Sequence, residues 1–507
     1  MSRLYSQGPD GVRWSIPSDG EIEARWREIS VAADGRQVVL VQGLGFVGAA
    51  VATAIAAARN AAGQPLYFVI GVDLATPDAW WKIASLETGR SPFAESDSEF
   101  ARLLHEAAVI EKNLVATSSH EAYKHADVIL VDVQLDVVSD LSGAAGDIRV
   151  GMENYEKALR CIGRGMKPGA LVIIETTVPI GMNRKVVRPI LEQERALRGI
   201  GSSLLLAHAY ERVMPGRRYL ESIRRFWRAF AADDEASGVA TARFLESFTD
   251  TASFPVSRLG GTTASEMAKL LENSYRAANI AFIHEWTLLA ERSGVNLWEV
   301  VDAIRVRKGT HDNMRYPGFG VGGYCLTKDS YLAQWGADHL LGLDCGLPVT
   351  LAALSTNYAM PLHTLNLLRE CLGGALANFK ALLCGVSYLA DVADTRNSPS
   401  IHFADAMLAE GGRLSYHDPL VEVWPERPEI PRHEELEQLM RHDAVVFAVP
   451  HAEYRQLRAE DFPRGMIVID AANVLNDQFA EALRSKECRV AGVGKGHWRE
   501  KGWHLNL

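Results

Sequence analysis

The chain has 507 residues, 48% of them hydrophobic and 23% charged, and its formal net charge is −10. At the usual length of about 150 residues per domain it is too long for one hydrophobic core, and we expect about three structural units. The negative charge argues against a general nucleic-acid or anionic-membrane surface. No signal peptide and no apolar stretch of roughly 18 residues is present, which predicts a cytoplasmic protein without a membrane partner. The six cysteines are scattered without a C-x-x-C pair, so neither a disulfide framework nor a metal site is predicted.

Buried strands are predicted in the first half of the chain, where β-branched and apolar residues form uninterrupted runs. Helix-length segments separate these runs, and strands that alternate with helices indicate a doubly wound parallel sheet. The runs are QVVLVQG (37–43), YFVIGVD (67–73), DVILVDV (127–133) and ALVIIET (170–176). Residues 1–35, before the first run, are polar and are predicted to form an N-terminal extension.

A glycine-rich turn follows the first predicted strand. GLGFVG carries Gly43, Gly45 and Gly48 at the G-x-G-x-x-G spacing and opens an alanine-rich helix. The first glycine permits a tight turn, the second lets a pyrophosphate approach the backbone, and the third lets the helix pack on the strand. Asp73 ends the next strand, where a carboxylate accepts hydrogen bonds from ribose hydroxyls and repels a 2′-phosphate. The pattern predicts bound NAD, and the alternative is a purely structural glycine turn.

A long helical segment is predicted from residue 263 to about residue 304, and we expect it to connect two lobes. It begins with Thr263-x-x-Glu266, the pattern of a capping box. Polar residues recur along it at intervals of 3, 4 and 3 and form one stripe. These residues are Glu266, Lys269, Asn273 and Arg276. The stripe is either the solvated face of an amphipathic helix or, at Lys269 and Asn273, a pair of hydrogen-bond donors for an oxyanion.

The segment YPGFGVGGYCLTKD (316–329) surrounds one cysteine with glycines and charges. Its glycines lack Cβ atoms, which would let backbone and thiol approach a ligand. Lys328 would favour a thiolate at Cys325, and Asp329 could pair with this lysine or manage a proton or a water. A lone cysteine in a loop is more often structural or incidental than catalytic. Beside a dinucleotide fold, however, the thiol could add to an aldehyde, and hydride transfer to NAD would leave a thioester that water hydrolyses.

A second α/β unit is predicted after this segment. Strand signals resume at ALLCGVSY (381–388), GRLSYHD (412–418), DAVVFAVP (443–450), MIVIDAA (466–472) and RVAGVG (489–494). The predicted fold class is therefore α/β, with two Rossmann-like doubly wound domains joined by a long central helix and an active cleft between the lobes. The predicted divisions are the extension (1–35), an NAD-binding domain (36–255), a central helical domain with the cysteine loop (256–375) and a C-terminal α/β domain (376–507).

From about residue 37 to residue 498 these motifs resemble, in order, those of the UDP-glucose/GDP-mannose dehydrogenase family. GLGFVG and Asp73 resemble its NAD site, SEMAKLLENSYRAANIAF its central helix, and VGGYCLTKD its nucleophile loop. ETTVPIG (175–181), YERVMPG (210–216) and the nucleotide-recognition segment GVSYLADVADTRNSPS (385–400) are similar to further family motifs. The resemblance implies an NAD-dependent nucleotide-sugar 6-dehydrogenase that oxidises a C6 alcohol through the aldehyde to the carboxylate, as a homodimer or higher homo-oligomer.

The resemblance also implies roles for single residues. Cys325 would be the nucleophile, and Lys269 and Asn273 would stabilise the oxyanion. Asp329 would position water or shuttle protons, and Glu211 would be a base for thioester hydrolysis. The implied cofactor contacts are Gly43, Gly45, Phe46, Val47, Gly48, Asp73, Glu175, Thr176 and Lys328. The implied substrate contacts, with the nucleotide sugar held by the C-terminal domain, are Arg276, Tyr316, Gly318, Gly322 and Arg396.

Several positions depart from the family pattern. They are Gln134-Leu135 in place of Thr-Pro, Tyr210 in place of proline, Tyr324 where histidine or serine is common, and Leu389 in place of lysine. The first change removes a threonine that helps to hold the catalytic water. GVGGYC is similar to the branch acting on UDP-N-acetylhexosamines, whereas Lys328-Asp329 resembles the UDP-glucose branch. The sequence therefore predicts a UDP-sugar and leaves the hexose open.

Two other functions remain open at this stage. A one-step β-hydroxyacid dehydrogenase shares a dinucleotide domain followed by a helical domain with Lys and Asn one turn apart, and it needs no thiol. A catalytically inactive nucleotide-sugar-binding protein would fit the changes at Gln134 and Tyr210. Counting the NADH formed per product separates all three functions.

Overall fold

The computed structural model describes residues 4–30, 35–93, 97–138, 148–213, 216 and 218–499. This part of the chain divides into two compact units. The first unit comprises the described residues up to 138 together with 148–271 and 332–345, and the second comprises 272–331 and 346–499. Met214 and Pro215 of the YERVMPG motif lie outside the described residues, as do residues 1–3 and 31–34 of the predicted extension. The predicted division into four segments stays a prediction.

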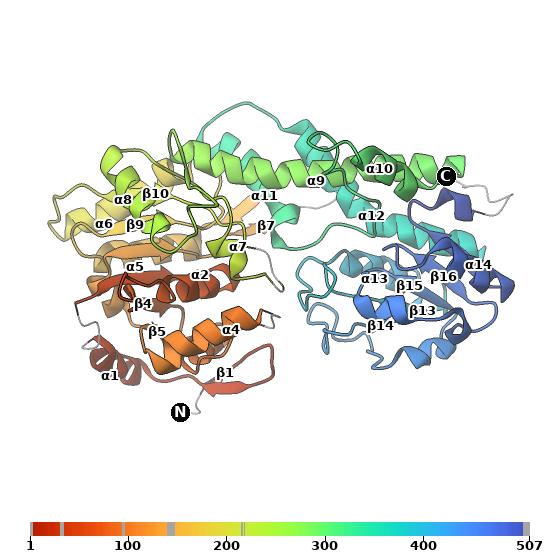
Figure 1. Ribbon diagram of the computed structural model, residues 1–507, viewed down its shortest axis with the longest axis horizontal. Helices are drawn as coiled ribbons and strands as arrows, with labels where there is room; N and C mark the ends of the chain where they lie inside the picture. The colour runs from red at the N-terminus through yellow and green to blue at the C-terminus, as the bar shows by residue number, and fades with distance from the viewer. Residues whose placement is uncertain are drawn as a thin grey trace. The chain divides into compact units, whose positions relative to one another are not determined.

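The first unit is built on an eight-stranded sheet (Figure 1). The strand order is β12-β11-β10-β9-β6-β3-β4-β5. The strands are β3 (Gln37–Gln42), β4 (Tyr67–Val72), β5 (Leu114–Thr117), β6 (Val128–Val131), β9 (Leu171–Ile174), β10 (Leu205–His208), β11 (Ala229–Ala232) and β12 (Ser257–Leu259). All neighbouring strands pair in parallel except β10 and β11, which are antiparallel. This parallel arrangement confirms the predicted doubly wound sheet.

Helices cover both faces of this sheet, which is why its strands read as continuous apolar runs. On one face the core includes side chains of α2 (Phe46–Ala56), α3 (Trp80–Glu87), α4 (Ser98–His105), α7 (Glu221–Arg224) and α8 (Glu235–Glu246). On the other face it includes side chains of α5 (Glu153–Gly165) and α6 (Arg188–Leu197). A separate antiparallel pair, β7 (Asp136–Val138) and β8 (Arg149–Gly151), lies between β6 and α5 in the chain.

The residues predicted as a polar extension pack onto the first unit. β1 (Tyr5–Gln7) and β2 (Arg13–Ser15) form a hairpin, and α1 (Asp19–Ser30) follows. The Ser6 hydroxyl donates to the Pro77 carbonyl (2.6 Å) and accepts from the Trp81 N–H (3.0 Å). Trp26 of α1 is buried in the core on one face of the sheet. A few buried contacts therefore hold a segment that the overall polarity did not allow us to place.

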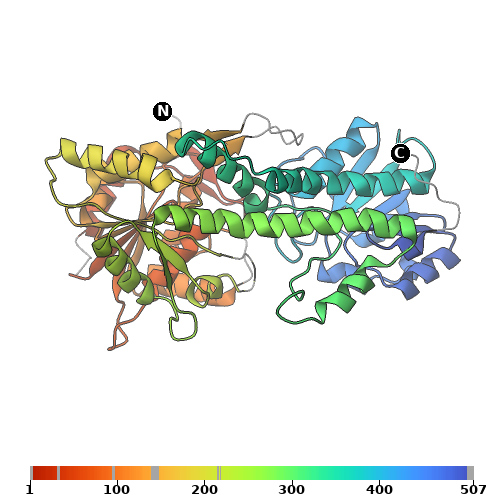
Figure 2. The ribbon, with the colours of Figure 1, turned by 90° about the horizontal axis from the view of Figure 1, so that it is seen from above.

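The helical segment predicted from 263 to 304 consists of two helices. α9 (Thr262–Ser293) ends before Gly294, whose φ is 73°, and α10 (Leu297–Arg305) begins after Asn296. The Asn296 side chain accepts from the Trp298 N–H (3.2 Å) and so caps α10. In the second unit α12 (Pro348–Leu372) runs beside α9 (Figure 2), and Asn357 Nδ2 donates to the Ala277 carbonyl (3.0 Å).

The second unit contains a five-stranded parallel sheet in the order β14-β13-β15-β16-β17. The strands are β13 (Lys380–Cys384), β14 (Arg413–His417), β15 (Ala444–Phe447), β16 (Ile467–Asp470) and β17 (Arg489–Gly492). α13 (Pro399–Ala409) and α14 (Asp477–Ser485) lie between strands in the chain, and α11 (Tyr324–Trp335) precedes the sheet. Since β14 lies on one side of β13 and the later strands on the other, this sheet is also doubly wound.

Both predicted sheets and the long helix are confirmed, but four strands of the first sheet were missed. β5, β10, β11 and β12 are each three or four residues long, and, unlike the equally short β6 and β9, they do not lie within any of the predicted seven-residue apolar runs. Among the described helices, none combines the length and the apolarity needed to cross a bilayer.

Candidate functional site

The turn after β3 has the geometry that a dinucleotide site requires. Gly43 has a φ of 96°, and its N–H donates to the Val72 carbonyl (2.8 Å). A Cβ at Gly48 would lie 1.9 Å from the Gly43 oxygen, so only glycine fits where α2 meets the strand. Nothing lies within 4 Å of a Cβ built at Gly45, which leaves space for a pyrophosphate. Phe46 and Val47 follow as the first two residues of α2, at the positive end of that helix.

Asp73 lies beside this turn, directly after β4. Its carboxylate accepts from the Leu44 N–H (2.9 Å) and the Leu74 N–H (2.8 Å). Lys82 Nζ lies 3.3 Å from Asp73 Oδ2. The bond to Leu44 ties the carboxylate to the glycine turn, which is where the sequence predicts it to meet a ribose.

Acidic residues gather around a buried arginine at the ends of β6, β9 and β10. Arg228 is 4% exposed, and its Nη2 contacts the carboxylates of both Glu175 and Glu211. Asp132 and Glu175 directly follow Val131 and Ile174, which are paired residues of β6 and β9, so the two carboxyl groups are neighbours. Burial raises the pKa of Glu175, and burial also raises the pKa of Asp132 to about 7. Thr176, next to Glu175, donates its hydroxyl to the Val131 carbonyl (2.9 Å).

Two members of this group, Asp132 and Arg228, were missed in the sequence. Asp132 stands inside the apolar run DVILVDV, and a carboxylate within a predicted buried strand was a signal that could have been followed. Arg228 belongs to the stretch RRFWRAF and carries no distinguishing local pattern.

Lys269 of α9 is buried against the same segment. Its Nζ donates to the Glu211 carbonyl (2.9 Å) and lies 5.7 Å from the centre of the Tyr210 ring. The structure therefore brings the predicted lysine and the predicted base together, through the backbone of Glu211. Tyr210, which stands where the family pattern has proline, also accepts a hydrogen bond from Arg212 Nη2 (3.0 Å).

Glu266 does not cap α9, and that prediction was wrong. Its carboxylate accepts from the N–H groups of Gly181 and Asn183, each at 2.7 Å, and so holds the turn that precedes α6. The helix begins at Thr262, whose N–H donates to Asp233 (3.0 Å). Burial raises the pKa of Glu266 to about 7. The predicted polar stripe is thus buried at Glu266, and the same holds at Lys269 and Asn273, so a solvated face is excluded for these three.

In the second unit, Asn273 and Asp329 are in direct contact. Asn273 Nδ2 donates to Asp329 Oδ2 (2.6 Å), and both side chains are buried. Lys328 Nζ lies 3.5 Å from Asp329 Oδ1 and 4.3 Å from the centre of the Tyr324 ring. The predicted pairing of Lys328 with Asp329 is formed, and the same carboxylate orients Asn273.

Cys325 is exposed in the first turn of α11. The sequence suggested a loop at this point, but the helix begins one residue earlier, at Tyr324. N–H groups in the first turn of a helix favour negative charge, including that of a thiolate.

The glycines before Cys325 serve mainly for packing within the second unit. A Cβ at Gly322 would lie 2.5 Å from Tyr388 Cβ, and one at Gly320 would lie 2.5 Å from Pro399 Cβ. Only at Gly318 is the space for a Cβ open. The prediction that these glycines make room for a ligand therefore fits Gly318, whereas the room at Gly320 and Gly322 is filled by residues 388–399.

Residues 388–399 also bond directly to the cysteine segment. The Gly323 N–H donates to the Arg396 carbonyl (3.2 Å), and Asn397 Nδ2 donates to Thr327 Oγ1 (3.2 Å). The Arg396 side chain is exposed and pairs with Asp394 (2.6 Å). Arg396 is thus held next to the cysteine segment by its backbone, and its guanidinium is paired with Asp394.

The remaining predicted substrate contacts lie in different surroundings. The Tyr316 hydroxyl donates to Asp302 (2.6 Å), and its ring stacks on Trp298 with centroids 5.2 Å apart. Arg276 is exposed on α9. Tyr316 is therefore already engaged by its neighbours in the second unit, whereas Arg276 faces solvent.

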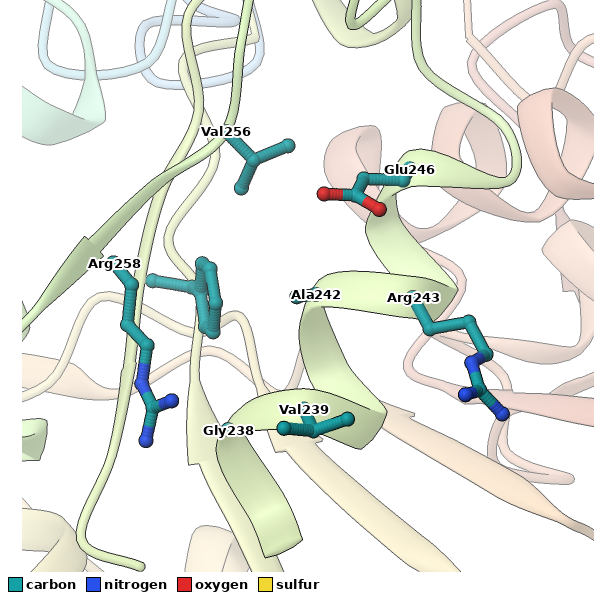
Figure 3. Close-up of a pocket in the computed structure, with 8 residues that line it drawn as sticks. Gly238, Val239, Ala242, Arg243, Glu246, Val256 and Arg258 are labelled. Atoms are coloured by element: carbon teal, nitrogen blue, oxygen red, sulfur yellow. The ribbon is translucent and has the colours of Figure 1, made fainter. Parts of the chain in front are cut away.

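A surface hollow of about 360 Å³ lies apart from all of these residues, between α8 and β12 (Figure 3). Phe230, Val239 and Val256 give it an apolar wall. Arg258 lies on one side and is paired with Glu235 (2.8 Å), and Arg243 lies on the other. None of the predicted site residues lines this hollow.

Three domains of one family match the chain. The NAD binding domain of the UDP-glucose/GDP-mannose dehydrogenase family matches residues 37–225, its central domain matches 263–358, and its UDP binding domain matches 382–477. The chain belongs to this family. The predictions of an oxidoreductase and of an NAD cofactor are thereby confirmed.

Individual members of the UDP-glucose/GDP-mannose dehydrogenase family align over most of the chain. UDP-N-acetyl-D-mannosamine dehydrogenase of Pyrococcus horikoshii is 32% identical over 87% of this chain and 96% of its own length. An NDP-N-acetyl-D-galactosaminuronic acid dehydrogenase of Ralstonia nicotianae is 27% identical over 86% and 95%. The solved structure of UDP-D-ManNAc dehydrogenase from Pyrococcus horikoshii matches with a TM-score of 0.76 at 28% identity, covering 91% of this chain and 100% of that one.

Proposed function

We propose that this protein is an NAD-dependent UDP-sugar 6-dehydrogenase that oxidises a C6 alcohol to a carboxylate through a thioester on Cys325. The observation that carries the proposal is the exposed thiol in the first turn of α11, on a segment packed against the predicted nucleotide-recognition residues 388–399. The matched NAD and UDP binding domains support it. Relatives named for N-acetylhexosamine substrates favour a UDP-N-acetylhexosamine over UDP-glucose.

The residues of the glycine turn fit a bound dinucleotide. Gly45 leaves open space beside the first turn of α2, and Asp73 presents a carboxylate next to it. NAD, when bound, accepts one hydride in each of the two oxidation steps. The protein's part is to bind the pyrophosphate at the start of α2 and to hold the adenosine ribose at Asp73.

The nucleophile and its supporting groups take the roles that the family resemblance implies, and the contacts of the supporting groups leave donors for those roles. The Cys325 thiolate adds to the aldehyde carbon, and negative charge develops on the former carbonyl oxygen. Asn273 has two N–H bonds on Nδ2, of which Asp329 takes one, so one remains for the oxyanion. Lys269 gives one N–H to the Glu211 carbonyl and retains two.

Hydrolysis of the thioester needs a base that activates water. Glu211 has this role in the proposal, because its carboxylate is buried beside Arg228 and its backbone holds Lys269. Gln134 stands where the family pattern has a threonine that helps to hold the catalytic water. Cytoplasmic location stays a prediction.

The proposed step is tested with Cys325→Ser and the matched control Cys345→Ser, which changes another exposed cysteine. Cys325→Ser should lower acid production by on the order of a thousandfold or more while NAD and UDP-sugar still bind, because serine is a poor nucleophile without an activating base. Unchanged acid production in Cys325→Ser would refute the covalent step. Two NADH per acid are expected with UDP-N-acetyl-mannosamine, and the same assay with its galacto isomer, UDP-glucose and GDP-mannose identifies the sugar.

We also propose a homodimer formed through one face of α9. Tyr275, Phe282, Trp286 and Leu289 are all exposed at intervals of seven, four and three residues, so they share this face. A row of large exposed apolar side chains on one helix marks an interface, and the resemblance implies a second copy of the chain as its partner. Trp286→Glu should yield monomers in analytical ultracentrifugation, whereas Leu197→Glu, at an exposed leucine of α6, should not. A monomeric wild-type protein would contradict the proposed homodimer.

A further inference from the structure

Three acidic side chains and one arginine meet where three neighbouring strands end. β10, β9 and β6 are adjacent in the first sheet, and Glu211, Glu175 and Asp132 follow them in the chain. Arg228 contacts Glu175 and Glu211, and its guanidinium lies 5.5 Å from the centre of the Phe248 ring. The proposed function uses Glu211 as a base but leaves the pairing of the other two acids unexplained.

The charges of this group do not balance if every acid is ionised. Three carboxylates and one guanidinium would carry a net charge of −2, and Glu175, Glu211 and Arg228 are all buried. Uncompensated charge in a buried site is strongly destabilising, and the usual outcome is that one of the acids takes up a proton. The group therefore needs at least one proton to be stable.

Two oxygen atoms indicate where that proton resides. Asp132 Oδ2 and Glu175 Oε2 are buried, and among the described residues no hydrogen-bond donor reaches either atom. Asp132 and Glu175 directly follow Val131 and Ile174, which pair in register on the adjacent parallel strands β6 and β9, so the two carboxyl groups are neighbours. A hydrogen bond between them would satisfy both atoms. Two carboxylates cannot make such a bond because both can only accept, whereas a carboxyl and a carboxylate can.

We propose that Asp132 and Glu175 share one proton at neutral pH and that this pair, together with Arg228, is a positioning device for Glu211. With the proton in place the group carries one negative charge less, and the guanidinium is left to pair with the Glu211 carboxylate. A carboxyl pair that cannot ionise fully because of like charge is the principle of the acid dyads of other enzymes. The catalytic consequence rests on the proposed function, but the shared proton does not.

The surrounding groups are consistent with this charge state. Burial raises the pKa of Asp132 to about 7, and the nearby charge of Glu211 adds to the rise. Lys269 faces the group from α9 through the Glu211 carbonyl, and Tyr155 faces Asp132 from α5. His208 on β10 has its pKa lowered by burial to about 4, so it is neutral and does not supply the missing positive charge.

The shared proton is tested with D132N, which keeps the size of the side chain and gives Glu175 a permanent N–H donor. D136N, at an exposed aspartate four residues along, is the matched control. Infrared difference spectra at pH 7 should show the carbonyl stretch of a buried protonated carboxyl in wild type minus D132N and none in wild type minus D136N, because the contribution of Glu266 cancels in both differences. Identical wild-type and D132N spectra in this region would overturn the proposal.

Thermal melting gives a second, substrate-independent readout. The raised pKa of Asp132 means that its proton stabilises the folded state at low pH, and that this contribution is lost as pH rises from about 4 to about 7. D132N cannot lose it, so the melting temperature of D132N relative to wild type should be higher at pH 8 than at pH 5. An equal difference at the two pH values would contradict the inference.

The link to Glu211 is tested separately in the dehydrogenase assay. D132N should change the pH profile of kcat for acid release and leave the KM for the UDP-sugar within about twofold, because the pair acts on a base and not on the sugar. An unchanged profile would remove the positioning role, even where the infrared band is lost. Absence of any NADH formation in wild type would instead overturn the proposed function and leave the proton pair standing.

Discussion

The two sheets of this protein begin with the same turn and use it differently. Gly43 ends β3 with a φ of 96°, and Gly385 ends β13 with a φ of 97°. Each glycine donates its N–H to the end of the neighbouring strand, at 2.8 Å in both cases. The next N–H, that of Leu44 or Val386, donates at 2.9 Å to an aspartate that comes after the neighbouring strand, Asp73 or Asp418.

The two turns differ in the segment that each one leads into. In the first unit α2 begins at Phe46, directly after the turn, so a helix N-terminus stands ready for a phosphate. In the second unit α13 begins only at Pro399, and the residues between bond and pack against the cysteine segment. The two turns have the same backbone geometry, and an aspartate accepts from each of them. In the first unit the turn leads directly into the N–H groups at the start of α2, whereas in the second unit it leads into a loop whose side chains pack on the cysteine segment.

The largest expected effect comes from filling the glycine positions. Gly48→Ala should lower the free energy of unfolding by about 3 kcal/mol or more, because its Cβ would meet the Gly43 oxygen at 1.9 Å. Gly385→Ala should have a similar effect in the second unit, where the Cβ would lie 2.4 Å from Val449 Cβ. Gly45→Ala is the matched control: it should keep wild-type stability in urea melts and weaken NAD binding about tenfold. A Gly48→Ala variant as stable as wild type would contradict the inference that close packing against the Gly43 oxygen requires glycine at this position.

The two aspartates should separate binding from stability. Asp418 is fully buried and accepts from Val386, Leu420 and Val421 N–H groups, so Asp418→Ala should cost about 3 kcal/mol of stability. Asp73→Ala should cost under about 1 kcal/mol in urea but raise the Kd for NAD by about tenfold to a hundredfold. Asp78→Ala, on the exposed loop after β4, is the control for both measurements. Equal loss of stability at Asp73 and Asp418 would remove the distinction between the two turns.

The pH dependence of stability should also differ between the units. Burial raises the pKa of Glu266 to about 7, so its contribution is greatest below about pH 4.5 and is lost as pH rises toward 7. Burial alone would raise the pKa of Asp418, but His451 and backbone N–H groups hold it below its usual value. The contribution of Asp418 is therefore constant above pH 5 and is lost only in stronger acid.

Urea melts at pH 5 and pH 8 test this contrast. Glu266→Gln should reduce the fall in stability between the two pH values by about 1–3 kcal/mol, while Asp418→Asn should leave that fall unchanged. The size of the constant loss in each variant is not the readout, because both substitutions disturb buried hydrogen bonds. If stability falls equally between pH 5 and pH 8 in wild type and Glu266→Gln, the raised pKa of Glu266 is not the cause of the fall.

The smallest effect is expected at Lys82, which pairs with Asp73 across 3.3 Å near the surface. Lys82→Ala should change stability by less than about 1 kcal/mol and the Kd for NAD by less than about threefold, because partly exposed ion pairs contribute little. Isothermal titration with NAD measures the second quantity. An effect as large as that of Asp73→Ala would mean that the ion pair, and not the tie to Leu44, holds the carboxylate.

The local pattern of the sequence was sufficient for much of the fold. The long apolar runs coincide with β3, β4, β6 and β9 and with all five strands of the second sheet. Gly43 and Gly45 lie in the turn between β3 and α2, Gly48 lies in the first turn of α2, and Asp73 follows β4. Glycine spacing and a strand-end carboxylate are both visible in the local sequence. The short strands β5, β10, β11 and β12 and the contacts of Glu266 were not predicted, since each depends on neighbours distant in sequence. The break at Gly294 was also missed, although Gly294 and the capping Asn296 are local signals.

The amino-acid sequence by itself determined the class of fold, the dinucleotide turn and the family motifs, because periodicity, glycine spacing and strand-end carboxylates are local properties. Only the tertiary structure decided which charges meet. Arg228 is far from Glu175 and Asp132 in the chain, and the order of strands in the sheet brings these side chains into one buried group. Likewise Asn273 meets Asp329, and the glycines before Cys325 receive Tyr388 and Pro399, only because packing joins segments that no local pattern connects.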